Sequence, residues 1–323
     1  MATDTNITIG KLGSLGLAIE VSAGTANATA AVYIPYANGP TLRGHHTPLE
    51  DISINTSRIM DKSSVLGKRW SEGDAEIWAD TVNSGYFWKL ALGNELLVTG
   101  TPNNHTFITT VSGNTPLTAT LIHSRGTTDI EQYTFCAIES LNFEVAEGLA
   151  KLTAAFKGQY PSNGASQTVT TTSGTVLAFK DYFVQFGATL TAAGTSATSP
   201  LTDFKLTIAN NLEVIHRSGS SDVSTIRTKG VKVTGSYTLF FDSITDRDAY
   251  YALQKRSLIL TASGINNESL RIRIPQFRLN EADVKTGLDT FYVVTANFVA
   301  EDVIDTGTRF IEVRLQNNKS VVY

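Results

Sequence analysis

Apolar and polar residues alternate along much of this chain, and an alternation of period two predicts β-strands with one buried and one wet face. In residues 230–242, Val233, Tyr237 and Leu239 fall on one face, and threonine and serine fall on the other. The same rule predicts strands at residues 49–59, 67–79, 106–111, 117–123, 132–145, 149–158, 201–209, 258–262, 270–277, 290–299 and 308–315. Three other segments lack this pattern. Residues 1–48 are expected to be irregular or extended, and residues 60–66 and 210–229 are expected to be polar loops.

Two short segments show helical spacing instead. After Asp80, which can cap a helix, Tyr86 and Leu90 lie four residues apart on one face, and Gly93 supplies a stop. Residues 246–255 form the second candidate helix and open on a capping-box pattern. Each candidate helix directly follows a predicted strand.

The strand and helix pattern occurs twice. Asp51-Ile-Ser-Ile-Asn55 aligns with Asp203-Phe-Lys-Leu-Thr207, Gly67-x5-Gly73-x6-Asp80 with Gly230-x4-Gly235-x6-Asp242, and Asn142-Phe-Glu-Val-Ala-Glu147 with Asn297-Phe-Val-Ala-Glu301. The sequence therefore predicts a mainly β protein of two tandem units, residues 1–160 and 176–323, each with one short α-helix. The low-complexity residues 161–175 form a polar linker between them.

Charge excludes a protein that grips nucleic acid. The formal net charge is −4; residues 1–165 carry 10 basic and 15 acidic residues, and residues 166–323 carry 16 and 15. Neither half has the basic excess that neutralises phosphates, so DNA would pass by this protein without being held. The N-terminus lacks a secretory signal and no stretch could span a membrane, which predicts a soluble chain made in the cytoplasm.

The sequence contains few residues or motifs that could carry out catalysis. The single cysteine, Cys136, lies in an apolar run and is expected to be a small buried residue. His45 and His46 are the one histidine pair, in a stretch rich in glycine and proline that gives no fixed set of metal ligands. Phosphate-binding, nucleophile-elbow and paired-cysteine motifs are absent from the sequence. We therefore expect no enzyme, no cofactor and no metal.

Acidic residues do cluster on predicted strands. Glu72, Asp74 and Glu76 alternate on one strand, and Glu139, Glu144 and Glu147 lie along another. A glycosidase would need two carboxylates about 5–10 Å apart in a cleft lined with aromatic residues. Acids spaced two apart share a strand face and repel one another unless solvated, so this pattern favours a wetted sheet face.

Several segments resemble the tail tube proteins (major tail proteins) of long-tailed bacteriophages. They are Leu15-Gly-Leu-Ala-Ile-Glu20, Ala23-Gly-Thr25, Tyr33-Ile-Pro35, Gly85-Tyr-Phe-Trp-Lys-Leu-Ala-Leu-Gly93, Asn104-His-Thr-Phe107 and Glu131-Gln-Tyr-Thr-Phe135. The resemblance covers most of the chain and is clearest over residues 15–160. No single motif is diagnostic, but their order and spacing are specific.

The resemblance implies a virion protein that is structural and not an enzyme. Members fold as tail-tube-like β-sandwich or half-barrel units with a flanking helix, and six units form a ring whose inner sheets join around a lumen. A chain with two units would then form a ring of three chains with pseudo-sixfold symmetry, and stacked rings would form the tube. The implied partners are further copies of the chain, the tape measure protein, the tail terminator and the baseplate, with non-specific passage of DNA and no membrane contact.

DNA must slide through such a tube, and a wall of acidic and small polar groups would repel its phosphates. The expected lumen-facing residues are Glu72, Asp74, Glu76 and Glu144 in the first unit and Thr234, Ser236 and Thr238 in the second. The candidates for contacts between rings are residues 1–14, 60–66, 210–229 and 316–323.

Two other functions are compatible with the sequence. A tail terminator or baseplate hub component with tube-like domains would close a tube and not extend it. A carbohydrate-binding β-sandwich would present exposed aromatic residues on one sheet face. Of the three tryptophans, Trp70 and Trp78 flank the acidic strand and Trp88 lies in the first predicted helix.

Overall fold

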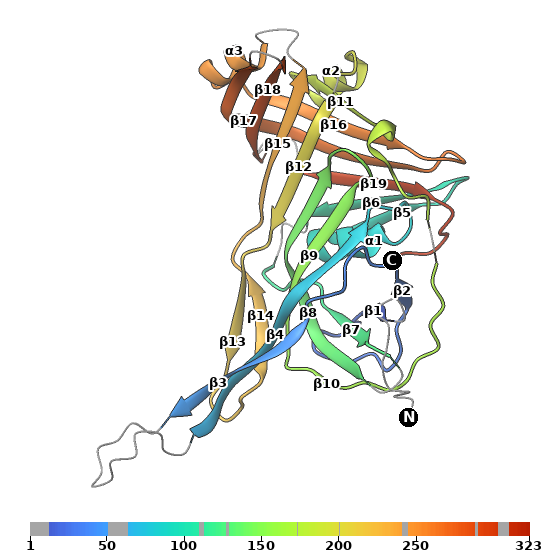
Figure 1. The fold of residues 1–323 in the computed structure, drawn as a ribbon, viewed down its shortest axis with the longest axis vertical. Helices are drawn as coiled ribbons and strands as arrows, with labels where there is room; N and C mark the ends of the chain where they lie inside the picture. Colours follow the sequence, from blue (N-terminus) through green and yellow to red (C-terminus); the bar gives the residue numbers. More distant parts are fainter. Residues whose placement is uncertain are drawn as a thin grey trace, which may run out of the picture.

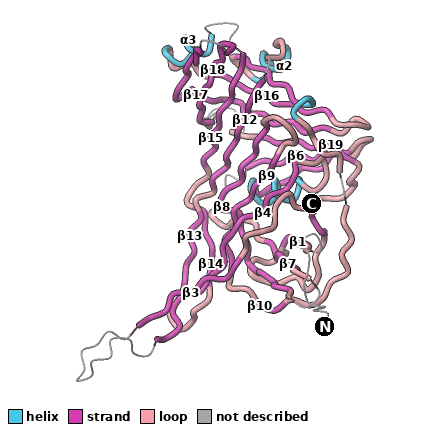
Figure 2. The backbone as a smooth tube through the Cα atoms, viewed as in Figure 1, coloured by secondary structure: helices cyan, strands magenta, loops and turns pink. Residues whose placement is uncertain are grey.

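The computed structural model describes residues 13–50, 64–109, 113–126, 129–172, 174–199, 201–240, 245–287, 290–302 and 310–323. The protein is mainly β, with 58% strand and 9% helix, which confirms the fold class predicted from the alternating pattern. Figure 1 shows strands from both halves of the chain lying in one extended layer, and Figure 2 shows helices α2 and α3 gathered at one end of it.

The strands of the first half are β1 (Ser14–Ile19), β2 (Val32–Ile34), β3 (Arg43–Glu50), β4 (Ser64–Trp78), β5 (Gly93–Val98), β6 (Asn103–Thr109), β7 (Ala119–Ser124), β8 (Ile130–Val145), β9 (Lys151–Gly158) and β10 (Ser162–Asn163). The strands of the second half are β11 (Tyr182–Gly187), β12 (Leu201–Ala209), β13 (Leu212–His216), β14 (Val223–Thr228), β15 (Lys232–Phe240), β16 (Arg256–Ser263), β17 (Ser269–Gly287), β18 (Thr290–Ala300) and β19 (Glu312–Asn317). The α-helices are α1 (Ser84–Leu92), α2 (Leu190–Thr195) and α3 (Thr245–Tyr251).

The two halves repeat one strand order in the main sheet. In the first half, β3 pairs with β4, β4 with β9, and β9 with β8. In the second half, β12 pairs with β15, β15 with β18, and β18 with β17. All these pairings are antiparallel. Strand β8 of the first half then pairs with β12 of the second, so the two sheets continue into each other.

Two local features fix the correspondence between the halves. Gly73 stands opposite Phe156 in the first half, and Gly235 stands opposite Phe298 in the second. At Gly73 a Cβ atom would lie 2.6 Å from the Leu42 backbone, so the close approach of the neighbouring segment requires glycine. The same crowding occurs at Gly235, where a Cβ would lie 2.4 Å from a backbone oxygen of β12.

A bulge supplies the second marker. The register of the last strand slips between Ile138 and Ser140 on β8, and between Leu279 and Glu281 on β17. A β-bulge bends its strand and changes the direction of the side chains that follow, and bulges are kept within protein families. Its presence at matching places indicates that β3, β4, β9 and β8 correspond to β12, β15, β18 and β17.

This correspondence corrects two of the sequence alignments. The segment beginning at Asn297 lies on β18, which corresponds to β9, whereas the segment beginning at Asn142 lies on β8. Residues 51–55 lie outside the described residues, and the stretch that corresponds to β12 runs over residues 41–45. Period-two patterns align about equally well in several registers, and only the backbone pairing separates them.

One hydrophobic core serves both halves. Phe143 of β8 contacts Trp88 of α1, with ring centroids 5.8 Å apart, and Phe204 of β12, with centroids 6.4 Å apart. Both halves contribute to the same buried cluster. Helix α1 forms where its apolar spacing predicts and ends at Gly93, which has a φ of 90°. The sequence predicted Asp80 as the residue that caps this helix, but the N-cap is Asn83, three residues later. The Asn83 N–H donates a hydrogen bond to the Asp80 carboxylate.

Several elements differ from the predictions. Residues 1–48 were expected to be irregular or extended, and their described part includes β1, β2 and most of β3. The first two residues of the strand predicted at 49–59 belong to β3, and the rest lie outside the described residues. The predicted loop at 60–66 gives its last three residues to β4, and its first four lie outside the described residues. Helix α2 breaks the expectation of one helix per unit.

The predicted loop at 210–229 was also wrong, because β13 and β14 form a hairpin there. This hairpin lies along the end of β4: Asp222 accepts two hydrogen bonds from Arg69, and the Arg69 N–H donates to the Ser221 carbonyl at 2.9 Å. Figure 1 shows β3, β4, β13 and β14 extending together at one end of the molecule. Polar hairpins of this kind are stabilised by distant contacts that a local pattern does not record.

Residues 161–175, expected as a polar linker, follow the surface of the first half. Strand β10 pairs with β8, Thr171 forms a parallel bridge with Tyr33, and the Thr175 carbonyl accepts a hydrogen bond from the Thr81 N–H. The connection therefore has fixed contacts along its length.

Candidate functional site: a polar sheet face

One face of the main sheet is polar across both halves, and we call it the polar sheet face. Its partly or fully exposed polar members are Glu72, Asp74, Glu76, Ser140, Asn142, Glu144, Lys151, Thr153, Lys157, Asp203, Lys205, Thr207, Lys232, Thr234, Ser236, Thr238, Glu281, Asp283, Thr295 and Asn297. The alternate residues of the same strands, among them Ile77, Leu206 and Tyr237, point into the core and are buried. The face therefore follows from the period-two pattern of each strand.

All seven residues expected to face a lumen lie on this polar sheet face. The Gly73–Gly235 correspondence places Thr234, Ser236 and Thr238 at the positions of the three acids of β4. Glu144 lies two strands away, on β8.

The strand register brings small polar groups into rows. Glu76, Thr153, Asn142, Thr207 and Thr234 stand opposite one another in turn along five strands. Within this row, the Thr207 hydroxyl donates to the Asn142 Oδ1 at 2.8 Å, across the junction of the halves. Beyond Glu76 at its end, the hydroxyl and amide groups of this row offer hydrogen bonds without a fixed charge.

A neighbouring row carries charge of alternating sign. Lys205 Nζ lies 2.9 Å from Glu144 Oε1, and Lys151 Nζ lies 3.5 Å from Glu76 Oε1. Lys157 Nζ similarly lies 3.2 Å from Glu139 Oε2. Lysines from adjacent strands thus offset several of the carboxylates on the polar sheet face.

The electrostatics of the junction follow from this pairing. Partial burial raises the pKa of Asp203, an effect that Lys205 opposes and the nearby Glu144 adds to. The hydrogen bond and charge of Glu144 raise the pKa of Lys205. The ammonium group therefore stays charged beside two carboxylates at neutral pH.

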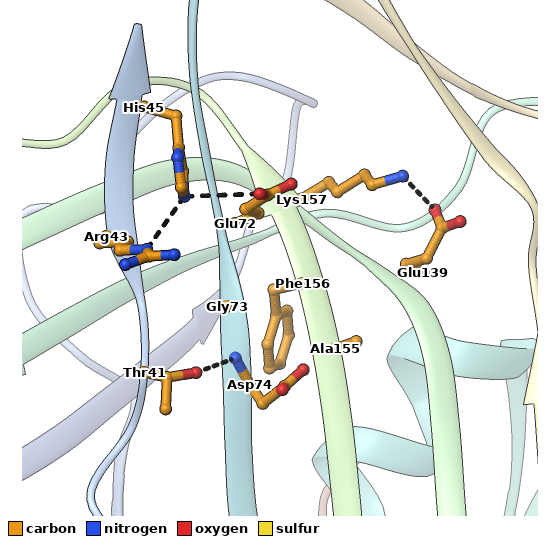
Figure 3. Close-up of a pocket in the computed structure, with 10 residues that line it drawn as sticks. All are labelled: Thr41, Arg43, His45, Glu72, Gly73, Asp74, Glu139, Ala155, Phe156 and Lys157. Carbon is orange, nitrogen blue, oxygen red and sulfur yellow. Dashed lines mark hydrogen bonds and ion pairs between the residues drawn. The ribbon is translucent and has the colours of Figure 1, made fainter.

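At the β3 edge the polar sheet face forms a hollow of about 510 Å³. Figure 3 shows its charged lining: His45 Nε2 lies 3.2 Å from Arg43 Nε and 3.4 Å from Glu72 Oε1. The Asp74 N–H donates to the Thr41 hydroxyl at 2.8 Å. The hollow is open, and ion pairs contribute to its lining.

The other candidate groups fall elsewhere. Cys136 is buried as expected, and burial raises the pKa of its thiol, so it stays protonated at neutral pH. His46 lies on β3 and is exposed, next to His45 in sequence. Among the described residues, no group of three or more histidine, cysteine, aspartate or glutamate side chains could hold a metal ion.

Sequence reasoning missed the basic members of the face. Lys151, Thr153 and Lys157 alternate with Leu152 and Phe156, so the signal was present in the period-two pattern of β9. Lys205 was equally visible on β12. Their pairing with particular carboxylates depends on strand register, which the sequence leaves open.

These features define a class: a β-rich structural protein with one long sheet, a wetted face, and edges at both ends of the strand order. A family model described as phage tail tube protein matches residues 10–300 of the chain. The chain belongs to the phage tail tube protein family. Comparison with curated proteins gave no match. Within the described residues, no helix is long and apolar enough to cross a membrane.

Proposed function

We propose that this chain polymerises into stacked rings that form the hollow tail tube of a phage, and that DNA passes through the tube. Membership of the tail tube family supports a structural subunit of the virion tail. The single observation that supports the finer proposal is the antiparallel β8–β12 pairing, which joins the main-sheet strands of the two halves edge to edge within the chain. The two units would be residues 1–160 and 176–323, joined by residues 161–175.

In this proposal three chains close a ring of six units, and the polar sheet face lines the lumen. Closure of a sheet removes its free edges, which otherwise invite uncontrolled pairing. Hydroxyl groups and lysines held in ion pairs give phosphates little to bind, and the surplus of carboxylates repels them weakly. DNA would therefore slide along the face.

Stacking of rings needs contacts along the tube axis. The joint extension of β3, β4, β13 and β14 is the strongest candidate, because its two hairpins are tied together by Arg69 and Asp222. The C-terminal residues are a weaker candidate, since Tyr323 is buried against the first half. Contacts with a tape measure protein, a tail terminator and a baseplate belong to the same proposal.

Negative-stain microscopy of the purified full chain tests the proposal. We expect hollow filaments or rings. Single rings that never extend would favour the tail terminator or baseplate hub function. A protein that remains monomeric at high concentration, with no annular particles, would contradict both.

A carbohydrate-binding function has less support. Trp88 is buried, His45 stacks on Trp70 with ring centroids 5.6 Å apart, and Lys151 Nζ lies 5.4 Å from the Trp78 ring centroid. Each ring is thus already covered by another part of the chain, where a sugar platform needs an open ring face. Binding on a glycan array would revive this alternative.

A further inference from the structure

The junction between the halves shows how one unit recognises the next. Strand β8, the last of the first unit in spatial order, pairs antiparallel with β12, the first of the second unit. In this register, Glu144 faces Lys205, Asn142 faces Thr207, and Ser140 faces Ala209. The contacts on the polar sheet face are the Lys205–Glu144 ion pair and the Thr207–Asn142 hydrogen bond.

The chain has one further strand edge that corresponds to the paired edge of β8 and one that corresponds to the paired edge of β12. Strand β17 corresponds to β8, and over residues 278–287 it pairs on one side with β18, while no described residue pairs with its other side. Strand β3 corresponds to β12, and it pairs with β4 on one side only among the described residues. Arg43, Glu281 and Asp283 are exposed at these edges.

The correspondence gives a register for these edges. Gly73 and Gly235 align residues 41–45 with 205–209, because Leu206 faces Gly235 and Leu42 lies against Gly73. The shared bulge and the Phe156–Phe298 correspondence align residues 140–143 of β8 with 281–284 of β17. Transferring the β8–β12 register then places Arg43 opposite Asp283, Leu42 opposite Val284, and His45 opposite Glu281.

We propose that residues 281–284 of β17 in one copy of the chain pair antiparallel with residues 42–45 of β3 in a second copy, with Arg43 facing Asp283 and His45 facing Glu281 across the junction. This inference rests on the proposed ring and names its closing contact. The internal junction carries one ion pair and one neutral hydrogen bond; the junction between chains sets the Arg43 guanidinium against the Asp283 carboxylate and the His45 imidazole against the Glu281 carboxylate. Charge complementarity at equivalent positions supports a second copy as the occupant.

The faces of the two edges also agree. Arg43 and His45 lie on the polar sheet face beside Glu72, while Leu42 is buried and Gly44 packs toward Tyr160. On β17, Glu281 and Asp283 are exposed, and Asn297 Nδ2 donates to Glu281 Oε2 at 2.6 Å on the same face. Pairing in any register shifted by one residue would set charged groups against the core side.

Disulfide trapping tests the register. The variant Arg43→Cys, Asp283→Cys should, on mild oxidation, give a ladder on non-reducing gels that ends at three chains. Cys136 is buried and will not compete. The matched control is Asn142→Cys, Thr207→Cys, the equivalent pair within one chain, which should close without any ladder. A second control is the variant Arg43→Cys, Asn280→Cys. Position 280 lies three residues along β17 from position 283, or about 10 Å, so these two cysteines should not cross-link.

Charge exchange tests the contact itself. Arg43→Asp or Asp283→Arg alone should raise the concentration needed for assembly by about tenfold or more, because like charges then face each other. The double variant Arg43→Asp, Asp283→Arg should restore assembly. Circular dichroism and thermal unfolding of each variant show that the chain still folds.

The outcomes separate the two proposals. Hollow particles from the unmodified chain, together with no cross-link at 43 and 283 and no rescue by exchange, would overturn this junction and leave the tube intact. Absence of any ring or filament from the unmodified chain would overturn both. A ladder ending at three chains, with rescue, supports the junction.

Discussion

At the scale of the residue, the buried carboxylate of Glu95 joins three separate parts of the chain. Its side chain is 1% exposed; Oε1 lies 2.7 Å from His105 Nδ1 and Oε2 lies 3.1 Å from Lys89 Nζ. The Tyr323 N–H donates to Oε2 at 2.9 Å. A buried carboxylate is tolerated only with such partners. Glu95 therefore fixes the C-terminal residue against α1 and β6.

These partners make the stability of the protein sensitive to acid. Burial acts to raise the pKa of Glu95, but hydrogen bonds from His105 and Lys89, the Lys89 charge and the Tyr323 N–H together lower it below its ordinary value of 4.5. The ionised form thus stabilises the folded state above the ordinary pKa, and this contribution is lost as the pH falls through the lower, folded-state value.

We predict that Glu95→Gln lowers the free energy of unfolding at pH 7 by about 3 kcal/mol, because it removes the buried carboxylate between Lys89 and His105, and Lys89 Nζ then keeps its contact with the Tyr323 carbonyl but has lost its buried counter-charge. The difference from the unmodified chain should shrink as the pH falls below the ordinary carboxyl pKa of 4.5 and through the lower pKa that Glu95 has in the folded state, because Glu95 itself is then neutralised. Urea unfolding at several pH values measures it, with the exposed Glu50→Gln as control. A difference that stays constant with pH would contradict the assignment.

At the scale of the element, β19 connects the two halves. It pairs with β17 of the second half and with β6 of the first. Beyond it the Tyr323 ring packs edge-on against Tyr86, with centroids 4.9 Å apart, and its hydroxyl accepts a hydrogen bond from Asn317 at 2.7 Å. A Cβ on Gly85 would lie 2.2 Å from this ring, so glycine there makes room for it.

We predict that Tyr323→Ala lowers the free energy of unfolding by about 3–5 kcal/mol, the usual cost of removing a large buried aromatic side chain. Val322→Ala is the matched control, since this neighbouring side chain is 55% exposed and its loss should change stability by less than about 0.5 kcal/mol. Differential scanning calorimetry compares the two. Equal melting temperatures for both variants would show that the contact adds no stability.

The elements also show what a sequence pattern can and cannot supply. Strand β4 and helix α1 were predictable because Ala75 and Ile77 alternate with acids, and Tyr86 and Leu90 recur at helical spacing. Strands β1 and β2 were missed because Leu15, like its neighbours on β1, is buried, so the strand shows a continuous apolar run without alternation. The polar hairpin β13–β14 was missed because a distant ion pair and a second small core hold it in place.

The candidate site was partly predictable for the same reason. Period two placed Glu72, Asp74 and Glu76 on one face, and the Gly73–Gly235 pattern carried that face into the second half. The lysines that pair with the carboxylates come from other strands, and a shift of one residue in register would have placed them in the core. The balance of lysines and carboxylates on the polar sheet face therefore follows from the strand register in the structure, and the sequence alone does not give it.

At the scale of the whole molecule, one continuous polar face spans both halves of the chain, and the main hydrophobic core contains residues of both. The charge of this face should govern the passage of DNA, because a phosphate backbone loses or gains affinity with each cation that it can neutralise. Asp74 is exposed and Glu76 lies in the row of small polar groups, so both can be changed without disturbing the core.

We predict that Asp74→Lys, Glu76→Lys leaves the tube intact but slows DNA delivery, and that raising the salt concentration during ejection reduces the defect, since the added lysines attract phosphates through a screened interaction. The matched control is Asp129→Lys, Asp248→Lys, which makes the same change of charge at the surface of a loop and of helix α3, away from the polar sheet face. Microscopy checks tube length, and infection kinetics report delivery. Normal kinetics in particles that carry both lysines on β4 would mean that this face does not meet the DNA, and the orientation of every unit in the ring would then have to be reversed.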